Sequence, residues 1–399
     1  MTKAKFPSIL LSAVPIGLGH MRAAQPIDQA AKGRVVLAST LGSEEEKKLW
    51  LGLTSRYELL SRITSIPFFS YFALKLLDRL QDIPPLEEGK DLSKPTLQVK
   101  ILAEMIQMGL GKEIVNQAKK SGLPFVTTFY ALSLAADMAG LKRIFCIIPD
   151  TQVNRAWVSL DPERSNIIYF VPVQETIDRL KAYGVPENHI YLTGFPLPRE
   201  NVENAGADLK ARLKRLGEKQ PLNVTFSIGG AGAQTDICLE VIKSLLPQIN
   251  SGKIIFNLSC GVRPQVKDYF ERKLERNKVN LFYSDNFKSY FNNFNKLLRQ
   301  TDILFTKPSE LSFFCALGLP MVLTPSIGPH ERYNKAWLEK IGACIDYHEA
   351  INNFSAKGGP ASGWDDLLAS GRFSQLAKNG FNNASREGTA KIVRLLRKL

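Results

Sequence analysis

The sequence has no apolar run of the ~18 residues that a membrane-spanning helix needs, and its first residues do not follow the pattern of a secretory signal peptide. Its five cysteines are scattered singly, without the spacing of zinc ligands or of a disulfide framework. Basic runs are short and no RNA-recognition motif is present, which argues against nucleic acid as a partner. We therefore expect a protein of the reducing cytoplasm, either dissolved there or bound peripherally to the inner face of the cell membrane.

The chain has 399 residues, 44% of them hydrophobic and 23% charged, as is typical of a globular protein with two domains. The formal net charge is +14. Residues 1–200 contribute 24 − 20 = +4 and residues 201–399 contribute 28 − 18 = +10. This excess favours anionic partners such as nucleotide phosphates or an anionic membrane surface.

A glycine turn follows the first predicted strand. The apolar run from Ile9 to Ile16 leads into Gly17-Leu-Gly19-His20, and a helix is predicted from about Met21 to Lys32. The two glycines let the main chain turn tightly and approach a ligand. Because an imidazole titrates near neutral pH, His20 at this helix start is a candidate general base.

A second polar group follows the strand predicted from Arg143 to Ile148. Asp150 comes directly after it, and Asn154 and Trp157 are close behind, so these residues form a candidate cleft wall. Three roles are open for Asp150: a second acid–base group, a carboxylate that orients His20, or the cap of the next helix.

The second half begins with the same pattern. A strand from Leu222 to Ile228 is followed by Gly229, Gly230 and Gly232, and then by a helix from Thr235 to Leu246. Main-chain N–H groups in such a turn, with the dipole of the helix, bind phosphates. We predict a diphosphate site here.

A further predicted strand–turn–helix lies between residues 302 and 323. Strands at Ile303–Phe305 and Met321–Leu323 enclose a helix that begins near Ser309, a candidate N-cap, and ends at Gly318. Lys307, Ser309 and Glu310 at this turn are predicted to meet a phosphate and a ribose diol. Past the second strand, His330, Glu331 and Asn334 lie at another helix start, where they are predicted to contact sugar hydroxyls or phosphate; an ordinary capped helix is the alternative.

The region from Leu41 to about Leu80 is rich in long apolar side chains. We interpret this region either as a buried hairpin of helices or as an element at an acceptor or membrane surface. In the second case the side chains inserted in the membrane interface are Phe68, Phe69, Tyr71 and Phe72.

We predict two domains. Residues 1–198 form the first domain and residues 199–381 the second, with a basic helix over about 382–399 that packs back onto the first. A single amphipathic helix is predicted from Leu97 to Lys120.

Several of these motifs resemble the family 28 glycosyltransferases, the group of the peptidoglycan N-acetylglucosamine transferase and monogalactosyldiacylglycerol synthase. Thr-Lys307-Pro-Ser-Glu310-Leu and Ala-Leu-Gly318-Leu-Pro are similar to the family's donor signature, although Ser309 and Glu310 stand where two small residues are usual. The loop ending in His20, followed by Ala23 and Ala24, also matches. Asp150 and Trp157 resemble the Asp and Trp of the glycolipid-synthase branch. The resemblance implies that residues 1–198 form the acceptor domain and residues 199–381 the donor domain. It also implies an acceptor-side location for four residues: Gly17, Gly19, Asn154 and Trp157.

The resemblance implies the GT-B fold, an α/β architecture with two Rossmann-like domains facing each other across a cleft. It implies an inverting transfer of a sugar from a nucleotide sugar, most simply a UDP-sugar, to a hydroxyl acceptor, with no cofactor and no required metal. The aromatic region and the basic charge favour a lipid-linked acceptor. Two alternatives remain: a UDP-sugar epimerase or hydrolase, and a non-catalytic protein that binds a nucleotide sugar or a lipid.

Overall fold

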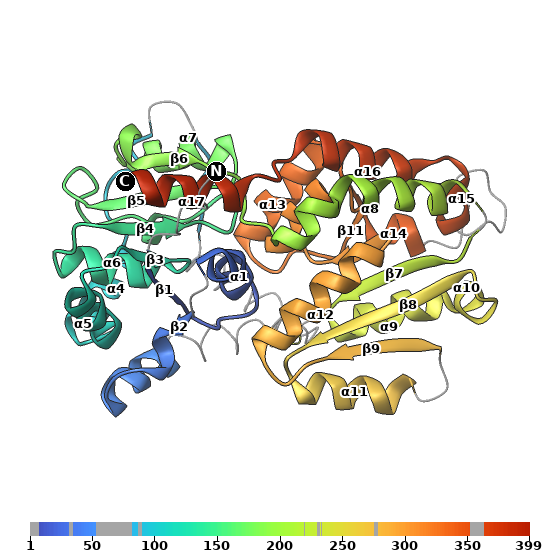
Figure 1. Ribbon diagram of the computed structural model, residues 1–399, viewed down its shortest axis with the longest axis horizontal. Coiled ribbons are helices and arrows are strands. Elements are labelled where there is room, and N and C mark those ends of the chain that lie inside the picture. The colour runs from blue at the N-terminus through green and yellow to red at the C-terminus, as the bar shows by residue number, and fades with distance from the viewer. Residues whose placement is uncertain are drawn as a thin grey trace, which may run out of the picture. The chain divides into compact units, whose positions relative to one another are not determined.

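The computed structural model describes residues 8–31, 35–52, 82–86, 90–218, 220–229, 232, 234–274, 278–351 and 363–399. The chain divides into two compact units (Figure 1). The first comprises Met1–Leu197, Gly328–Tyr333 and Arg386–Leu399, and the second comprises Pro198–Ile327 and Asn334–Ser385.

The first unit is built on a parallel sheet of six strands in the order β2-β1-β3-β4-β5-β6. The strands are β1 (Leu10–Ala13), β2 (Val36–Leu37), β3 (Phe125–Thr127), β4 (Ile144–Ile147), β5 (Ile167–Val171) and β6 (Ile190–Leu192). Its α-helices are α1 (Gly19–Ala31), α4 (Leu97–Gln107), α5 (Lys112–Ser121), α6 (Tyr130–Met138), α7 (Gln174–Ala182) and α17 (Gly388–Lys398). Short 3-10 turns are η1 (Ala38–Thr40), η2 (Arg155–Trp157) and η3 (Glu187–His189).

The second unit holds a second parallel sheet of six strands, in the order β12-β11-β10-β7-β8-β9. The strands are β7 (Leu222–Ser227), β8 (Ile254–Gly261), β9 (Val279–Tyr283), β10 (Ile303–Thr306), β11 (Met321–Leu323) and β12 (Cys344–Asp346). The helices are α8 (Arg199–Gly217), α9 (Thr235–Ser244), α10 (Leu246–Asn250), α11 (Pro264–Leu274), α12 (Phe287–Gln300), η4 (Glu310–Leu317), α14 (Tyr347–Ile351), α15 (Gly363–Ala369) and α16 (Arg372–Asn383). Helix α13 (Pro329–Lys340) begins in residues that group with the first unit.

Helices cover both faces of the second sheet. In Figure 1, α8 and α16 lie on one side of it and α9 and α11 on the other. All residues of β10 and β11 are therefore buried, and the sequence reads there as a continuous apolar run. The two parallel sheets confirm the predicted α/β class with two Rossmann-like domains.

The helix predicted from Leu97 to Lys120 is wrong, because the chain forms two helices there. Gly109 and Gly111 between α4 and α5 take positive φ angles of 113° and 78°, which a regular helix does not contain. The turn directs Leu110 into the core of the first unit, where it is 1% exposed. Burial of one leucine between two glycines thus decides the break.

The structure describes residues 41–52 of the aromatic region, and residues 44–52 are helical. Trp50 is only 1% exposed, and its ring lies 6.3 Å from that of Phe129 in the core. A side chain buried in this way does not reach a membrane, so Trp50 is a core residue. Phe68, Phe69, Tyr71 and Phe72 lie outside the described residues. Within the described part of the chain, no helix is long and apolar enough to cross a membrane.

Helix α17 packs within the first unit. Thr389 Oγ1 donates to the Leu197 carbonyl at 2.7 Å, and α17 contacts α1. Gly388 begins the helix with its main chain directly against the Phe195 carbonyl, where no side chain fits.

Candidate functional site

In each sheet there is one strand from which the chain first extends the sheet on one side and later returns to extend it on the other side. From β1 the chain runs to β2 on one side, while β3 pairs with the other side of β1. From β7 it runs to β8, and β10 pairs with the other side of β7. Parallel α/β sheets bind ligands outside the carboxyl ends of the strands at such points. The motifs selected from the sequence follow these strands.

At the first of these points, His20 meets the residue that follows β3. His20 Nδ1 lies 2.6 Å from the main-chain oxygen of Thr128, and the Thr128 hydroxyl donates to the His20 carbonyl at 2.9 Å. A carbonyl oxygen only accepts hydrogen bonds, so Nδ1 carries the proton of the neutral ring. Nε2 then keeps its lone pair, which is the form that a general base needs.

Aromatic rings surround this histidine. The Phe129 ring is nearly perpendicular to the imidazole, with the ring centres 4.9 Å apart, and the centre of the Trp157 ring lies 6.1 Å away. Tyr130 stacks obliquely on Trp157 at 5.3 Å. Trp157 is 6% exposed, so this predicted acceptor-side residue contributes mainly packing beside His20.

The other predicted residues of the first unit take different places. Gly17 adopts a left-handed conformation (φ 69°), as the turn requires, and Gly19 begins α1. Asp150 follows β4 and is partly buried. Asn154 caps the short η2 helix, because its Oδ1 accepts from the Ala156 N–H at 3.2 Å. Asp150 was also predicted as the carboxylate that orients the His20 ring. In the structure His20 Nδ1 bonds to the Thr128 carbonyl, which orients the ring in that way.

At the corresponding point of the second sheet, Gly229 follows β7 and Lys307 follows β10. A Cβ atom on Gly229 would lie 3.1 Å from Lys307 Cε, so the lysine side chain runs along this glycine. Gly232 takes a positive φ of 77°. The prediction that these two turns share one edge of a sheet therefore agrees with the strand pairing, and a cationic side chain lies beside the glycine turn. Gly230 lies outside the described residues.

The helix that begins at Glu310 is a 3-10 helix of eight residues, which is long for that form. Ser309 occupies the N-cap position, but its hydroxyl makes no capping bond. Gly318 ends the helix in the left-handed conformation (φ 72°), as predicted. Ser309 and Glu310 are 9% and 8% exposed, so only a small part of each is open to a ligand.

The residues predicted around α13 are mostly buried. Asn334 is fully buried, and its amide donates to the Pro308 carbonyl at 3.1 Å, which supports the turn that carries Lys307. Glu331 is 1% exposed and lies 3.9 Å from the Nε2 atom of His330. His330 and Glu331 belong to the stretch that groups with the first unit.

Two polar residues at these points escaped the sequence analysis. Thr128 bears no motif of its own, and only its place after a buried strand marked it. Gln234 has a left-handed conformation (φ 71°), which is uncommon for a residue other than glycine. Its amide nitrogen donates to the Pro325 carbonyl and its amide oxygen accepts from Thr324, both at 2.6 Å. Gln234 therefore joins the loops after β7 and β11.

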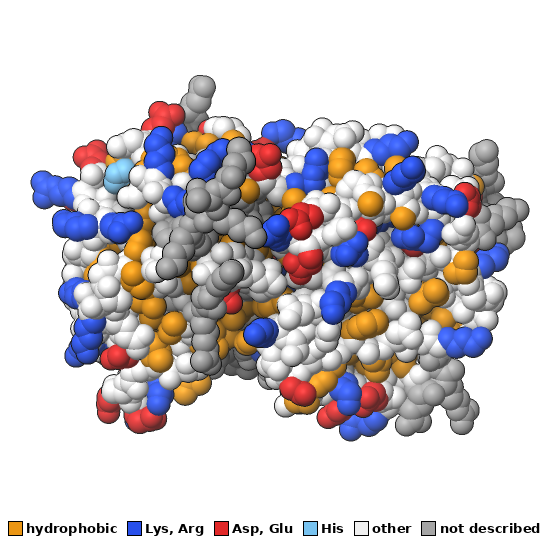
Figure 2. Space-filling view, viewed as in Figure 1, with side chains coloured by type: hydrophobic (Ala, Val, Ile, Leu, Met, Phe, Trp, Pro, Cys, Tyr) orange, Lys and Arg blue, Asp and Glu red, His pale blue; other side chains and the backbone are white. Residues whose placement is uncertain are grey.

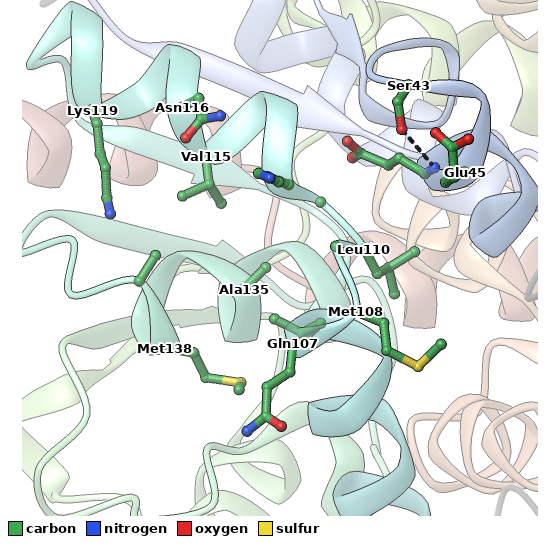
Figure 3. A pocket seen from close by; sticks show the side chains of 16 residues that line it. Ser43, Glu45, Gln107, Met108, Leu110, Val115, Asn116, Lys119, Ala135 and Met138 are labelled. Atoms are coloured by element: carbon green, nitrogen blue, oxygen red, sulfur yellow. Dashed lines mark hydrogen bonds between the residues drawn. The ribbon is translucent and has the colours of Figure 1, made fainter.

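A pocket of about 440 Å³ opens elsewhere in the first unit, where the turn between α4 and α5 meets the end of α6. Figure 3 shows Ser43 and Glu45 on one side of it and Asn116 and Lys119 on the other. None of the residues predicted for catalysis or binding lines this pocket. In the described part of the chain, no group of three or more His, Cys, Asp or Glu side chains is arranged to hold a metal ion.

Comparison with known proteins links the chain to glycosyltransferases. A domain family of unknown function, DUF6938, matches residues 185–280 and 265–353. The chain is 31% identical to an uncharacterized glycosyltransferase, YkoN, of Bacillus subtilis over 31% of this chain and 29% of the relative. It is 22% identical to a processive diacylglycerol beta-glucosyltransferase of Staphylococcus epidermidis over 50% of this chain and 48% of the relative. The matches thus span about half the length of these curated relatives or less.

Solved structures extend the likeness to the whole chain. MurG of Acinetobacter baumannii superposes with a TM-score of 0.50 at 12% identity, covering 98% of this chain and 100% of MurG. A UDP-GlcNAc 2-epimerase of Methanocaldococcus jannaschii, in complex with UDP-GlcNAc and UDP, gives 0.51 at 13% identity, covering 98% and 99%. The chain has the GT-B fold, and the resemblance to GT-B glycosyltransferases is confirmed.

Proposed function

We propose that this GT-B chain is an inverting glycosyltransferase, which moves a sugar from a UDP-sugar to a hydroxyl group of a lipid-linked acceptor. The observation that carries the proposal is the position of His20 and the tautomer of its ring. The histidine follows the carboxyl end of β1, and its Nδ1 bonds to the Thr128 carbonyl, so the neutral ring carries its lone pair on Nε2. A basic nitrogen at this point of the sheet suits deprotonation of an acceptor hydroxyl.

In the proposed reaction, His20 Nε2 takes the proton of the acceptor hydroxyl while the acceptor oxygen attacks the anomeric carbon. The bond from that carbon to the diphosphate oxygen breaks, and UDP leaves with the electron pair. Lys307 and the main-chain N–H groups of the Gly229 turn would stabilise the charge that develops on the diphosphate, in place of a metal ion. Asp150 is the second acid–base candidate.

The choice of UDP rests on the family resemblance and on neighbours of the same fold that are described with UDP. Glu310 is proposed to accept the ribose hydroxyls, and Ser309 and Gly232 to line the phosphates. His330, Glu331 and Asn334 are proposed as further donor contacts or, for the buried Asn334, as support for the Lys307 turn.

A lipid-linked acceptor at the inner face of the cell membrane is supported by a relative named for diacylglycerol and by the surface of the first unit. Three apolar side chains of α4 and its C-cap are exposed: Leu97 (73%), Ile101 (47%) and the C-cap residue Met108 (72%). Lys94 and Lys100 are exposed close to them in the chain. Figure 2 shows apolar side chains among basic ones on the first unit. Such a combination favours contact with anionic lipid.

The first experiment measures sugar transfer from a panel of UDP-sugars to diacylglycerol in mixed micelles. His20→Gln should lower kcat by about 10²–10⁴, the usual contribution of a general base, with UDP affinity unchanged. His189→Gln, which changes a histidine at η3 outside the site, serves as the matched control and should keep full activity. Full turnover by His20→Gln, with loss in Asp150→Asn, would reverse the two assignments.

The second experiment separates the alternatives. Calorimetric titration with UDP should show binding by the wild type and weaker binding by Glu310→Ala; equal affinities would remove Glu310 from the site. Conversion of the UDP-sugar without any acceptor would identify an epimerase or a hydrolase. UDP binding with no turnover of any substrate would identify a binding protein. Flotation with anionic vesicles at low salt, compared with Ile101→Ser, tests the membrane contact.

A further inference from the structure

We propose that Thr127 and Thr128 are positioning residues, whose two hydroxyls together fix the ring of His20 in its Nδ1–H tautomer. The inference rests on the proposed role of His20 as general base and adds what selects its active form. Neither threonine contacts the reacting atoms in this proposal. They act through the main chain and the ring of His20.

The first part of this arrangement joins β1 to β3. Ser12 of β1 is paired with Thr127 of β3, so the residues after the two strands leave the sheet side by side. Thr128 bonds to His20 twice: its hydroxyl donates to the His20 carbonyl at 2.9 Å, and its own carbonyl accepts from Nδ1 at 2.6 Å. One bond holds the main chain of His20 and the other holds its ring, although the two residues are 108 positions apart.

The second part fixes the direction of the Thr128 carbonyl. The Phe129 N–H donates to Thr127 Oγ1 at 3.1 Å. This N–H and the Thr128 C=O belong to the same trans peptide group, in which they point in opposite directions. Anchoring the N–H on the Thr127 hydroxyl therefore aims the carbonyl away from Thr127, to the side on which it meets the imidazole.

Burial protects the hydrogen bonds of the Thr127 and Thr128 hydroxyls from water, so that they favour one tautomer of His20. Thr127 and Thr128 are fully buried, so water does not compete for their hydroxyls. The Phe129 ring, nearly perpendicular (83°) to the imidazole at 4.9 Å, limits the other orientations of His20. An Nε2–H tautomer in the same position would bring a nitrogen lone pair against the carbonyl oxygen, which is repulsive. The arrangement thus favours one tautomer of the neutral ring.

The direct test is the protonation of each ring nitrogen, read by ¹⁵N NMR of the full-length protein above the pKa of the ring. His20→Gln identifies the signals of His20 among the four histidines of the chain. We expect a protonated Nδ1 and an unprotonated Nε2. An Nε2–H tautomer, or a rapid equal exchange between the two forms, would overturn the proposal whether or not the protein transfers sugar.

The second test uses Thr127→Val, which keeps the shape of the side chain but removes the oxygen that accepts from Phe129. We expect a mixture of tautomers and a kcat lower by roughly three- to tenfold, the effect of one lost hydrogen bond. Thr127→Ser should restore both properties. Thr193→Val is the matched control, because Thr193 is a buried threonine after β6 whose hydroxyl donates to the Gly194 carbonyl at 2.9 Å. It should keep the wild-type tautomer and kcat.

The outcomes separate the two proposals. A wild-type tautomer in Thr127→Val would show that Thr127 does not position the ring. If Nδ1–H is found and Thr127→Val disturbs it, but His20→Gln retains full turnover, the positioning stands and the general-base assignment fails.

Discussion

Arg212 of α8 is expected to be among the strongest stabilising residues of the second unit. It is 1% exposed, and its guanidinium donates to four main-chain carbonyls: Nε to Thr301 (2.7 Å), Nη1 to Leu317 (3.1 Å) and Gly318 (2.9 Å), and Nη2 to Leu298 (3.4 Å). These carbonyls lie at the ends of α12 and η4, where a helix provides no internal donors. One side chain therefore completes two helix ends.

Arg212→Met removes all these donors while keeping much of the apolar stem. At about 1–1.5 kcal/mol for each of the four carbonyls left without its donor, less about 1 kcal/mol gained because a buried charge is removed, we expect a loss of about 3–5 kcal/mol. For a unit of this size the loss lowers Tm by roughly 6–20 °C. Burial lowers the pKa of Arg212 to about 10, so the side chain stays charged at neutral pH and the loss should be the same at pH 6 and pH 8.

The assay is calorimetric or urea unfolding of the full chain. Arg199→Met is the matched control, because Arg199 lies on the same helix with a side chain that is 81% exposed and forms a surface ion pair with Glu203. It should change stability by no more than about 0.5 kcal/mol. A Tm of Arg212→Met within one or two degrees of the wild type would refute the reasoning.

Three further predictions follow from single contacts and from the proposed mechanism. Burial raises the pKa of Glu46, because the folded protein favours the uncharged carboxyl group. Folding therefore becomes less favourable as the pH rises and Glu46 ionises. Glu46→Gln should have a higher Tm than the wild type at pH 8, with a smaller difference at pH 4. Gly388→Ala should lower Tm, because a Cβ there overlaps the Phe195 carbonyl. Gly206 lies at an exposed position of α8 where a Cβ would meet no other atom, so Gly206→Ala should stabilise by about 0.5–1 kcal/mol. Turnover should persist in EDTA; restoration by Mg²⁺ of an activity lost in EDTA would contradict the metal-free mechanism.

The sequence by itself determined the repeating βα pattern and most strand positions. The strands predicted at Arg143–Ile148, Ile303–Phe305 and Met321–Leu323 are found at Ile144–Ile147, Ile303–Thr306 and Met321–Leu323. These strands were readable because a covered parallel sheet needs continuous apolar runs, which turn residues interrupt. The end of η4 at Gly318 was predictable for a similar reason, since a left-handed helix end favours glycine.

Choices that depend on long-range packing were decided only in the tertiary structure. Apolar periodicity continues from Leu97 to Lys120, and the break at Gly109 and Gly111 depends on a core that receives Leu110. In the same way, the sequence pattern around a tryptophan on an apolar helix is the same whether the side chain lies in the core or at a membrane surface. The contact with Phe129 shows that Trp50 lies in the core, and it applies to that residue alone.

The candidate site shows the same division. His20 stood out because a glycine turn and a helix start surround it in the chain. Thr128 did not, because its meaning arises from the pairing of β1 with β3, which brings together residues 108 positions apart. Local sequence sets which segments become strands and turns; the order of strands in the sheet, fixed by burial of the whole core, sets which turns meet and therefore which tautomer His20 holds.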